Sequence, residues 1–270
     1  MNNNEIKTTI KNIVVEPFYE DINGETDIFL HCYKAQLPVI LKGPTGCGKS
    51  RFVENMSYKL NKNLIQVSCN EETSSVDLLG RYLVKGGDTI WQDGPVTKAV
   101  KENCVLYLDE ISEAREDVIV VLHPLSDYRR EIYIDKINLK IKANENFMLV
   151  VSFNPGYQKG FKELKISTRQ RFVGISFNYP NEKKEIQIII RESGIYESVA
   201  KNLVLYANKV RKLTELDLSE TISTRLLINA AKLIRLGVDK KIACNSSIIQ
   251  PLSDDKDINE SLLDILNLYF

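Results

Sequence analysis

A glycine-rich loop restricts the folds open to this sequence more than any other segment. Residues 43–50, GPTGCGKS, fit the pattern G-x-x-x-x-G-K-[ST] and stand between the apolar run 38–41 and a stretch with helical periodicity, 51–60. Such a loop wraps backbone N–H groups around phosphates, and glycine is needed because a side chain would block that approach. The order strand, loop and helix predicts an α/β fold with a nucleotide site. A chance match at a strand–turn–helix corner is the alternative.

The loop pattern also assigns expected roles to individual residues. Lys49 is expected to reach the β- and γ-phosphates of the nucleotide, and Ser50 is expected to ligate Mg²⁺. The expected cofactors are therefore ATP and Mg²⁺. The residues expected to bind them at this loop are Gly43, Pro44, Thr45, Gly46, Cys47, Gly48, Lys49, Ser50 and Arg51.

A second apolar run, residues 104–108, leads directly into two adjacent carboxylates, Asp109 and Glu110. A continuous apolar run is typical of a strand buried on both faces of a parallel sheet, whose carboxyl end opens at the ligand crevice. Asp109 is therefore expected to hold Mg²⁺ through water, and Glu110 to polarise the attacking water as a general base. Alternatively, the run is an ordinary buried strand that ends in acidic surface residues.

The composition agrees with a cytoplasmic enzyme and disfavours several other classes. The chain has 270 residues with 36 basic and 36 acidic side chains, so no overall basic excess indicates nucleic acid. Residues 1–5 begin no leader pattern, and no apolar run reaches the ~18 residues of a membrane span, so we expect a protein neither secreted nor embedded. Five scattered cysteines predict reduced thiols, and two isolated histidines, His31 and His123, disfavour a zinc site.

Apolar runs alternate with helical patterns along the first two thirds of the chain. Strands of this kind joined by crossover helices form a doubly wound sheet, so we predict five parallel strands. From residue 181 onward helical periodicity replaces the strand signals, and Tyr179-Pro180 is the expected joint. The predicted domains are a nucleotide-binding domain at 1–180 and a small helical domain at 181–270. The predicted strands are 38–41, 64–69, 105–108, 147–152 and 173–177.

Two β-hairpins are predicted within this scaffold. One spans residues 81–91 around Gly86-Gly87, a dipeptide that suits a tight primed turn, and the other spans 131–141, where apolar and polar side chains alternate. As moving loops around a central pore, the hairpins would grip a substrate through Tyr82 and Trp91. Alternatively, the two rings only pack within their hairpin.

Further polar positions complete the candidate site. Asn154 ends the fourth strand and is expected beside Asp109, where its amide would orient the water or contact the γ-phosphate; an ordinary Asn-Pro turn is the alternative. Arg169 and Arg171 precede the fifth strand, and one of them would stabilise phosphoryl charge as an arginine finger, unless both form surface ion pairs. Arg225 opens a helix of the small domain, where it would contact the γ-phosphate or form a solvated helix start.

Taken in order along the chain, these motifs resemble those of an AAA+ ATPase of the MoxR branch, and more closely those of the CbbQ/NirQ/NorQ subfamily. Gas-vesicle ATPases are more distant relatives. The resemblance covers nearly the whole chain. It rests on the strings LKGPTGCGKSRFVE (41–54), DLLGRY (77–82), WQDGPVT (91–97), YLDEISEAREDVIVVLHPLSD (107–127), NPGYQ (154–158), KISTRQRF (165–172) and IQPLSDDKD (249–257).

The resemblance implies an AAA+ core with a five-stranded parallel sheet, two inserted hairpins and a helical lid. It further implies a ring-forming ATPase, usually hexameric, that works with a von Willebrand factor A-domain partner on a client enzyme, either Rubisco or nitric oxide reductase. The motifs of the family correspond here to Walker A (Lys49, Ser50), Walker B (Asp109, Glu110), sensor 1 (Asn154), sensor 2 (Arg225) and a trans-acting arginine finger (Arg171, with Arg169 a weaker match).

Other functions stay open beside an Mg-ATP-driven remodelling motor. A nucleotide-gated scaffold, for example in gas-vesicle or other complex assembly, would bind its partner with little turnover and need not keep Glu110 or the arginines. A DNA motor is disfavoured by the neutral charge. The residues do not separate Rubisco from nitric oxide reductase as the client.

Overall fold

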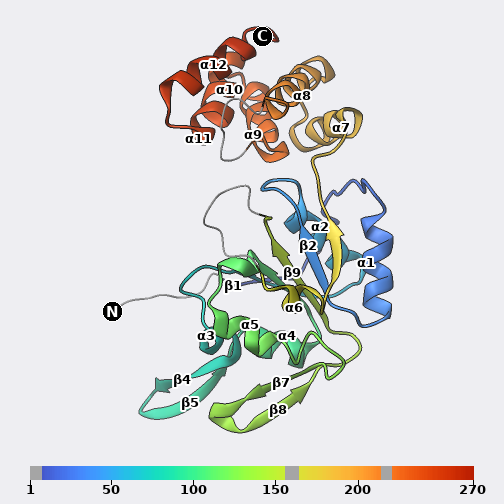
Figure 1. Cartoon of the computed structure of the whole chain (residues 1–270), viewed down its shortest axis with the longest axis vertical. Coiled ribbons are helices and arrows are strands. Elements are labelled where there is room, and N and C mark those ends of the chain that lie inside the picture. Colours follow the sequence, from blue (N-terminus) through green and yellow to red (C-terminus); the bar gives the residue numbers. More distant parts are fainter. Residues whose placement is uncertain (1–7, 156–163, 214–220) are drawn as a thin grey trace. The chain divides into compact units, whose positions relative to one another are not determined.

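The computed structural model describes residues 8–155, 164–213 and 221–270 (Figure 1). Two of the sequence observations lie outside the described residues. They are the N-terminal segment 1–5 and residues 156–158 of the NPGYQ string.

The chain divides into two compact units. Among the described residues, the first unit contains 8–42, 49–155 and 164–176. The second unit contains the glycine-rich loop, 43–48, together with 177–213 and 221–270. The first unit is an α/β structure, and the second is helical.

The first unit is built on a six-stranded sheet in the order β1-β3-β6-β9-β2-β10 (Figure 1). All neighbours except β1 and β3 pair in parallel, so the carboxyl ends of five strands meet at one edge, where ligands bind in sheets of this type. The strands are β1 (Thr8–Lys11), β2 (Val39–Lys42), β3 (Leu64–Ser68), β6 (Val105–Asp109), β9 (Met148–Phe153) and β10 (Val173–Ser176).

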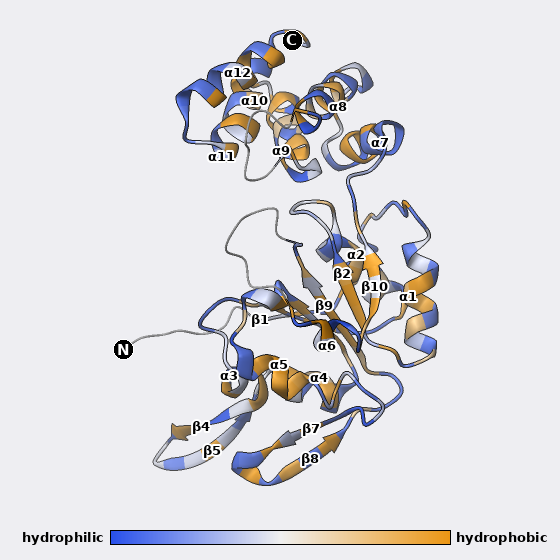
Figure 2. Cartoon of the chain, in the orientation of Figure 1, coloured by the Kyte–Doolittle hydropathy of each residue, from blue (hydrophilic) through white to orange (hydrophobic). Residues whose placement is uncertain are grey.

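The five parallel strands confirm the predicted sheet. They are detectable from the sequence because β2, β6 and β9 are almost wholly buried and therefore apolar, as the orange of β2 in Figure 2 illustrates. The sequence does not predict β1, which adds a sixth, antiparallel strand beside β3. Three of its four residues are exposed, so this edge strand carries no apolar run that periodicity would reveal.

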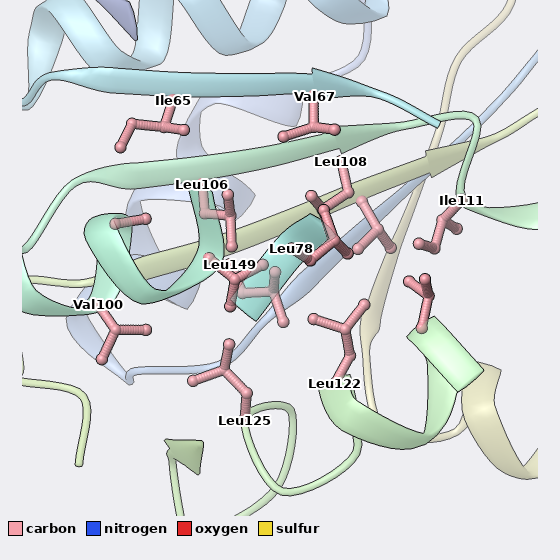
Figure 3. Close-up of a cluster of buried hydrophobic side chains, with 14 of the residues drawn as sticks. Ile65, Val67, Leu78, Val100, Leu106, Leu108, Ile111, Leu122, Leu125 and Leu149 are labelled. Carbon is pink, nitrogen blue, oxygen red and sulfur yellow. The ribbon is translucent and has the colours of Figure 1, made fainter. Parts of the chain in front are cut away.

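Helices pack against the sheet through a core that joins three strands (Figure 3). Ile65, Leu106 and Leu149 come from adjacent strands and belong to one buried cluster with Val100 and Leu122 from two helices. The predicted helical stretch 51–60 is confirmed by α2. The helices of this unit are α1 (Glu25–Lys34), α2 (Lys49–Lys59), α3 (Ser75–Leu79), α4 (Pro95–Glu102), α5 (Glu116–Leu122) and α6 (Ile166–Arg169), with 3₁₀ turns η1 (Ile111–Glu113) and η2 (Asp135–Ile137).

Both predicted hairpins are present. The first pairs β4 (Gly80–Lys85) with β5 (Asp88–Asp93), and positive φ at Gly86 and Gly87 confirms the primed turn. The second pairs β7 (Glu131–Ile134) with β8 (Leu139–Lys142). They are drawn at the lower edge of Figure 1.

The aromatic side chains of the first hairpin pack on each other. The rings of Tyr82 and Trp91 meet edge to face with centroids 5.2 Å apart. Tyr82 also donates a hydrogen bond of 3.2 Å to the carbonyl of Lys136, which lies in the turn of the second hairpin. The packing alternative is therefore realised here, and a substrate contact by Tyr82 and Trp91 stays a prediction.

The second unit is a helical bundle with its own core. The C-terminal part of the unit begins at Phe177. Helix α7 starts after Asn181, whose side chain caps it by accepting from the N–H of Lys184. None of the described helices has both the length and the apolarity that crossing a membrane requires. The helices are α7 (Glu182–Ser193), α8 (Glu197–Arg211), α9 (Thr224–Arg235), α10 (Lys240–Cys244), a π-helical turn (Asn245–Ile249), α11 (Gln250–Leu252) and α12 (Lys256–Leu266).

A buried ion pair ties three helices of this bundle together. The Glu185 carboxylate is fully buried and accepts two hydrogen bonds from Arg211, of 2.7 and 2.8 Å, and one of 2.6 Å from the hydroxyl of Thr224. Arg211 also donates to the carbonyl of Ile222 and lies over the ring of Tyr179. Because the charge of Glu185 is matched by hydrogen bonds on both oxygens, its burial is tolerated.

Candidate functional site

The glycine-rich loop joins β2 to α2. Gly46 has φ 69° and Gly48 has φ 103°, in the left-handed region that favours glycine, which is the local reason for glycine at these two positions. Within the second unit, the carbonyl of Thr45 accepts a hydrogen bond of 3.1 Å from the hydroxyl of Tyr179. The chain then enters α2, whose first two residues are Lys49 and Ser50.

The Lys49 ammonium group lies at the carboxyl edge of the sheet. It is buried and donates a hydrogen bond of 2.7 Å to Oδ1 of Asn154. The Asn154 amide nitrogen in turn donates one of 3.1 Å to Oε1 of Glu110. Three residues from separate motifs are thus brought together, because β6 and β9 are neighbours and β2 lies beyond β9.

The second pair of candidate residues, Ser50 and Asp109, lies beside this chain of contacts. Ser50 Oγ donates to Asp109 Oδ2 over 3.3 Å. The other carboxylate oxygen, Oδ1, accepts from the Tyr107 hydroxyl at 2.6 Å and from the Ser152 hydroxyl at 2.5 Å. A hydroxyl and a carboxylate oxygen side by side are the hard oxygen donors that Mg²⁺ prefers, so the donor set fits this ion.

Tyr107 is a neutral donor in this cluster. Its side chain is fully buried. Burial first, and then the charge of Asp109, raise the pKa of its hydroxyl well above the ordinary value. The phenol is therefore protonated at neutral pH and donates its hydrogen bond to Asp109.

Glu110 has an unusual backbone conformation. Its φ of 55° and ψ of 49° lie in the left-handed region, which is uncommon for a residue with a side chain and recurs at functional sites. Its backbone N–H donates a hydrogen bond of 3.0 Å to Ser152 Oγ. Partial burial raises the pKa of its carboxyl, with further increases from Asp109 and Glu113, whereas Lys49 opposes the shift.

The two arginines before the fifth strand differ in their contacts. Arg171 donates to Asp127 Oδ2 over 2.9 Å, and its buried Nε has no hydrogen-bond partner among the described residues. Asp127 also accepts two hydrogen bonds from the side chain of Arg129, and these bonds are the main cause that lowers the Asp127 pKa to about 2. Arg169 ends α6, and within the described ranges its side chain forms no hydrogen bond or ion pair. Neither arginine contacts the Lys49–Asn154–Glu110 group.

Arg225 is the second residue of α9. The Ser223 side chain caps this helix by accepting from the N–H of Leu226, which explains why the helix starts here. Arg225 is exposed, and within the second unit a Cβ built at Gly46 would lie 3.3 Å from its Cβ. Arg225 is thus near the glycine-rich loop, and its contact with a γ-phosphate stays a prediction.

Sequence reasoning missed Tyr107, Ser152 and Asp127. The signal for the first two is a hydroxyl inside an otherwise apolar strand, which has to find a partner when buried. Ser152 lies in β9, two residues before Asn154, which directly follows the strand, and Tyr107 lies two residues before Asp109 in β6. Residues two apart in a strand share a face, so both hydroxyls point to the side that carries the candidate site.

Two family models match this chain. Residues 38–172 match the AAA domain of the dynein-related subfamily, which defines the class of the nucleotide-binding fold. Residues 185–269 match the CbbQ/NirQ/NorQ C-terminal domain. Together with the relatives described next, the two matches show that the chain belongs to the CbbQ/NirQ/NorQ family of AAA proteins.

Three relatives are similar over nearly their full length. Protein NorQ of Paracoccus denitrificans is 47% identical over 99% of this chain and 99% of its own. Denitrification regulatory protein NirQ of Pseudomonas aeruginosa is 48% identical over 94% of this chain and 97% of its own. Protein CbbQ of Hydrogenophilus thermoluteolus is 47% identical over 92% of both chains.

Solved structures support the fold alone. A putative ATPase from Cytophaga hutchinsonii has a TM-score of 0.51 at 18% identity and covers 91% of this chain and 82% of its own. A point mutant of Thermotoga maritima RuvB has a TM-score of 0.52 at 19% identity and covers 92% of this chain and 72% of its own. Both identities are too low to carry an argument about activity.

Proposed function

We propose that this protein is an Mg-ATP-dependent AAA+ remodelling ATPase that activates or matures a client enzyme. The observation that carries the proposal is the hydrogen-bonded group of Lys49, Asn154 and Glu110, with Ser50 and Asp109 beside it. A phosphate-binding cation, a water-orienting amide and a carboxylate are the groups that phosphoanhydride hydrolysis requires. A protein that only bound the nucleotide would not need Glu110 near that amide.

Each residue has a defined part in the proposed reaction. The backbone N–H groups of the glycine-rich loop bind the phosphates, and Lys49 neutralises charge on their β- and γ-oxygens. Ser50 and Asp109 would hold Mg²⁺, which when bound withdraws charge from the phosphate oxygens. Asn154 orients the attacking water, and the Glu110 carboxylate accepts its proton.

Two arginine roles remain, and both act on charge that develops during phosphoryl transfer. Arg171, with Arg169 as the alternative, is proposed to enter the site of a neighbouring subunit in a homo-hexamer. Arg225 is proposed to contact the γ-phosphate from a lid domain at 181–270, which follows a nucleotide-binding domain at 1–180 in the sequence. Loss of the γ-phosphate would then change how both arginines are held and move the hairpins.

Membership of the family supports a proposal for the partners. We propose a von Willebrand factor A-domain protein as adaptor, and nitric oxide reductase or Rubisco as the client, since the relatives include NorQ, NirQ and CbbQ. The protein would work in the cytoplasm, where ATP is supplied, without inserting into a membrane. Nucleic acid is not a proposed partner because the chain has no net charge.

A nucleotide-gated scaffold with little turnover is the second candidate. The observation that favours it is the ion pair of Arg171 with Asp127 in its own chain, which occupies the proposed finger. In a scaffold this pair would persist with nucleotide bound. In a motor it would open when subunits assemble.

Phosphate release by the purified protein with Mg-ATP, with and without the adaptor, separates the candidates. A motor turns over steadily, and Glu110→Gln keeps ATP binding while losing turnover. The matched control is Glu116→Gln, a change of the same kind at an exposed carboxylate in α5. A wild-type protein that binds ATP but releases no phosphate under either condition is a scaffold.

A further inference from the structure

The two oxygens of the Asp109 carboxylate are in different surroundings. Oδ1 accepts short hydrogen bonds from two hydroxyls, those of Tyr107 at 2.6 Å and Ser152 at 2.5 Å. Among the described residues, Oδ2 accepts only the longer 3.3 Å bond from Ser50. Charged acceptors form the stronger hydrogen bonds, so the two short bonds hold the carboxylate in one rotamer.

The two hydroxyl donors are themselves fixed. Tyr107 and Ser152 both have no exposed surface, and each lies in a central strand of the sheet. Tyr107 pairs with Val150 across β6 and β9, which puts Ser152 opposite the end of β6. Since neither side chain can turn toward solvent, Oδ1 is permanently engaged and Oδ2 is the oxygen left to face Ser50.

Tyr107 has a second contact of 3.5 Å with Ser50 Oγ, whereas Ser152 has a second bond, to Glu110. The Oγ of Ser152 accepts a hydrogen bond of 3.0 Å from the backbone N–H of Glu110, while its hydroxyl donates a hydrogen bond to Asp109. The bond from the Glu110 N–H restrains the backbone of Glu110, whose left-handed conformation is uncommon for a residue with a side chain. Ser152 therefore connects the residue proposed to bind the metal with the residue proposed to accept the proton.

We propose that Tyr107 and Ser152 are positioning residues of the ATPase site. Their hydroxyls present Oδ2 of Asp109 to Mg²⁺, and Ser152 additionally aims Glu110 at the water. This inference rests on the proposed function, specifically on Mg²⁺ binding by Asp109. Neither hydroxyl touches the nucleotide in this account, so each acts through the residues it contacts: Asp109 and Ser50 for Tyr107, and Asp109 and Glu110 for Ser152.

Binding of a fluorescent ADP analogue, measured in Mg²⁺ and again in EDTA, tests the proposal without relying on turnover. Tyr107→Phe and Ser152→Ala each remove one hydroxyl. We expect each to reduce the Mg²⁺-dependent gain in affinity by about 10- to 100-fold, the range seen when partners of metal ligands are removed. Affinity in EDTA should not change, because the phosphate contacts of the loop are intact.

Matched controls come from equally buried hydroxyls elsewhere in the chain. Tyr206→Phe removes a hydroxyl that donates to the carbonyl of Leu262 in the helical bundle, and Ser57→Ala removes one that donates to the carbonyl of Lys62. Both controls should keep the Mg²⁺-dependent gain. Ser152→Thr keeps a hydroxyl at the same place and should restore most of the gain lost in Ser152→Ala.

Turnover then separates the two positioning residues. At saturating Mg²⁺, Tyr107→Phe should regain kcat, because its defect lies in metal affinity alone. Ser152→Ala should keep a low kcat at every Mg²⁺ concentration, because Glu110 has also lost its support. Equal recovery of both variants would overturn the second part of the proposal.

Asp109→Asn distinguishes failure of this inference from failure of the proposed function. If Asp109→Asn removes the Mg²⁺-dependent gain while Tyr107→Phe and Ser152→Ala leave it intact, the positioning role is wrong and the ATPase assignment stands. If Asp109→Asn itself leaves the gain intact, Asp109 is not the metal ligand, and the proposed function fails at that step.

Discussion

Lys49 and Glu110 are linked through a single amide, that of Asn154. The lysine donates a hydrogen bond of 2.7 Å to Oδ1 of Asn154, and the amide nitrogen donates one of 3.1 Å to Oε1 of Glu110. This orientation of the amide is the one that satisfies a cation on one side and a carboxylate on the other. A nucleotide phosphate that drew Lys49 away would break its hydrogen bond to Asn154, so the contact is suited to respond to ATP.

Removing this amide should slow the chemistry more than it weakens binding. We expect Asn154→Ala to lower kcat by about 10²- to 10³-fold, as for other preorganised polar groups, with little change in ATP affinity. Steady-state kinetics and nucleotide titration measure the two effects. Asn146→Ala, a change of the same kind before the start of β9, is the control. A variant that loses ATP affinity and keeps kcat would show that Asn154 only binds the nucleotide.

The hydrolysis rate should fall in acid at a higher pH than an ordinary glutamate would give. Partial burial and the charges of Asp109 and Glu113 raise the Glu110 pKa, and only the ionised carboxylate accepts a proton. As pH falls through that raised pKa, the base is protonated and kcat drops. A pH profile of kcat at saturating Mg-ATP measures the midpoint.

A neighbouring charge provides the control for this pH dependence. Glu113→Gln removes one cause of the raised Glu110 pKa, so the acid limb of the profile should move to lower pH. Asn154→Ala removes a hydrogen bond that lowers the same pKa, so its limb should move to higher pH. Shifts in the reverse directions would mean that the limb reports another group.

Arg171 should be essential for turnover and dispensable for folding. If it stabilises phosphoryl charge, Arg171→Ala should lower kcat by about 10³- to 10⁵-fold. Arg129→Ala removes the other arginine bound to Asp127 and should leave kcat near that of the wild type. Arg169→Ala identifies the finger: a larger loss there than in Arg171→Ala would reverse the assignment.

The buried pair of the helical bundle should dominate its stability. Arg211→Leu leaves the fully buried Glu185 carboxylate without its counter-charge, which should cost about 3–5 kcal/mol of unfolding free energy. Arg115→Ala breaks an exposed ion pair with Asp117 and should cost about 0–1 kcal/mol. Denaturant unfolding compares the two. Equal losses would show that burial adds nothing to the value of the Arg211 pair.

The parallel sheet and both hairpins are predictable because each has a local signal. Buried strands such as β9 are continuous apolar runs, and Gly86-Gly87 specifies its own turn. The edge strand β1 has no such signal, since its side chains face solvent and it pairs with the distant segment β3. Its existence is decided by tertiary contacts.

The candidate site also contains residues that the sequence predicts and contacts that only the folded structure reveals. Lys49, Asp109 and Asn154 are recognisable from motifs that end strands or open helices. The contacts of Tyr107 and Ser152 depend on the register of β6 against β9, which no local pattern in either strand specifies. The partner of Arg171, Asp127, is 44 residues away along the chain, so only the folded structure reveals it.

The central claim, hydrolysis at a site completed by a neighbouring subunit, is tested most directly by mixing two inactive variants. Lys49→Ala cannot bind phosphates but carries an intact Arg171, and Arg171→Ala has the opposite defect. The account predicts that phosphate release, absent from either variant alone, returns when they are mixed with Mg-ATP and the adaptor. A mixture that stays inactive while wild-type subunits mixed in the same way are active would contradict the shared site.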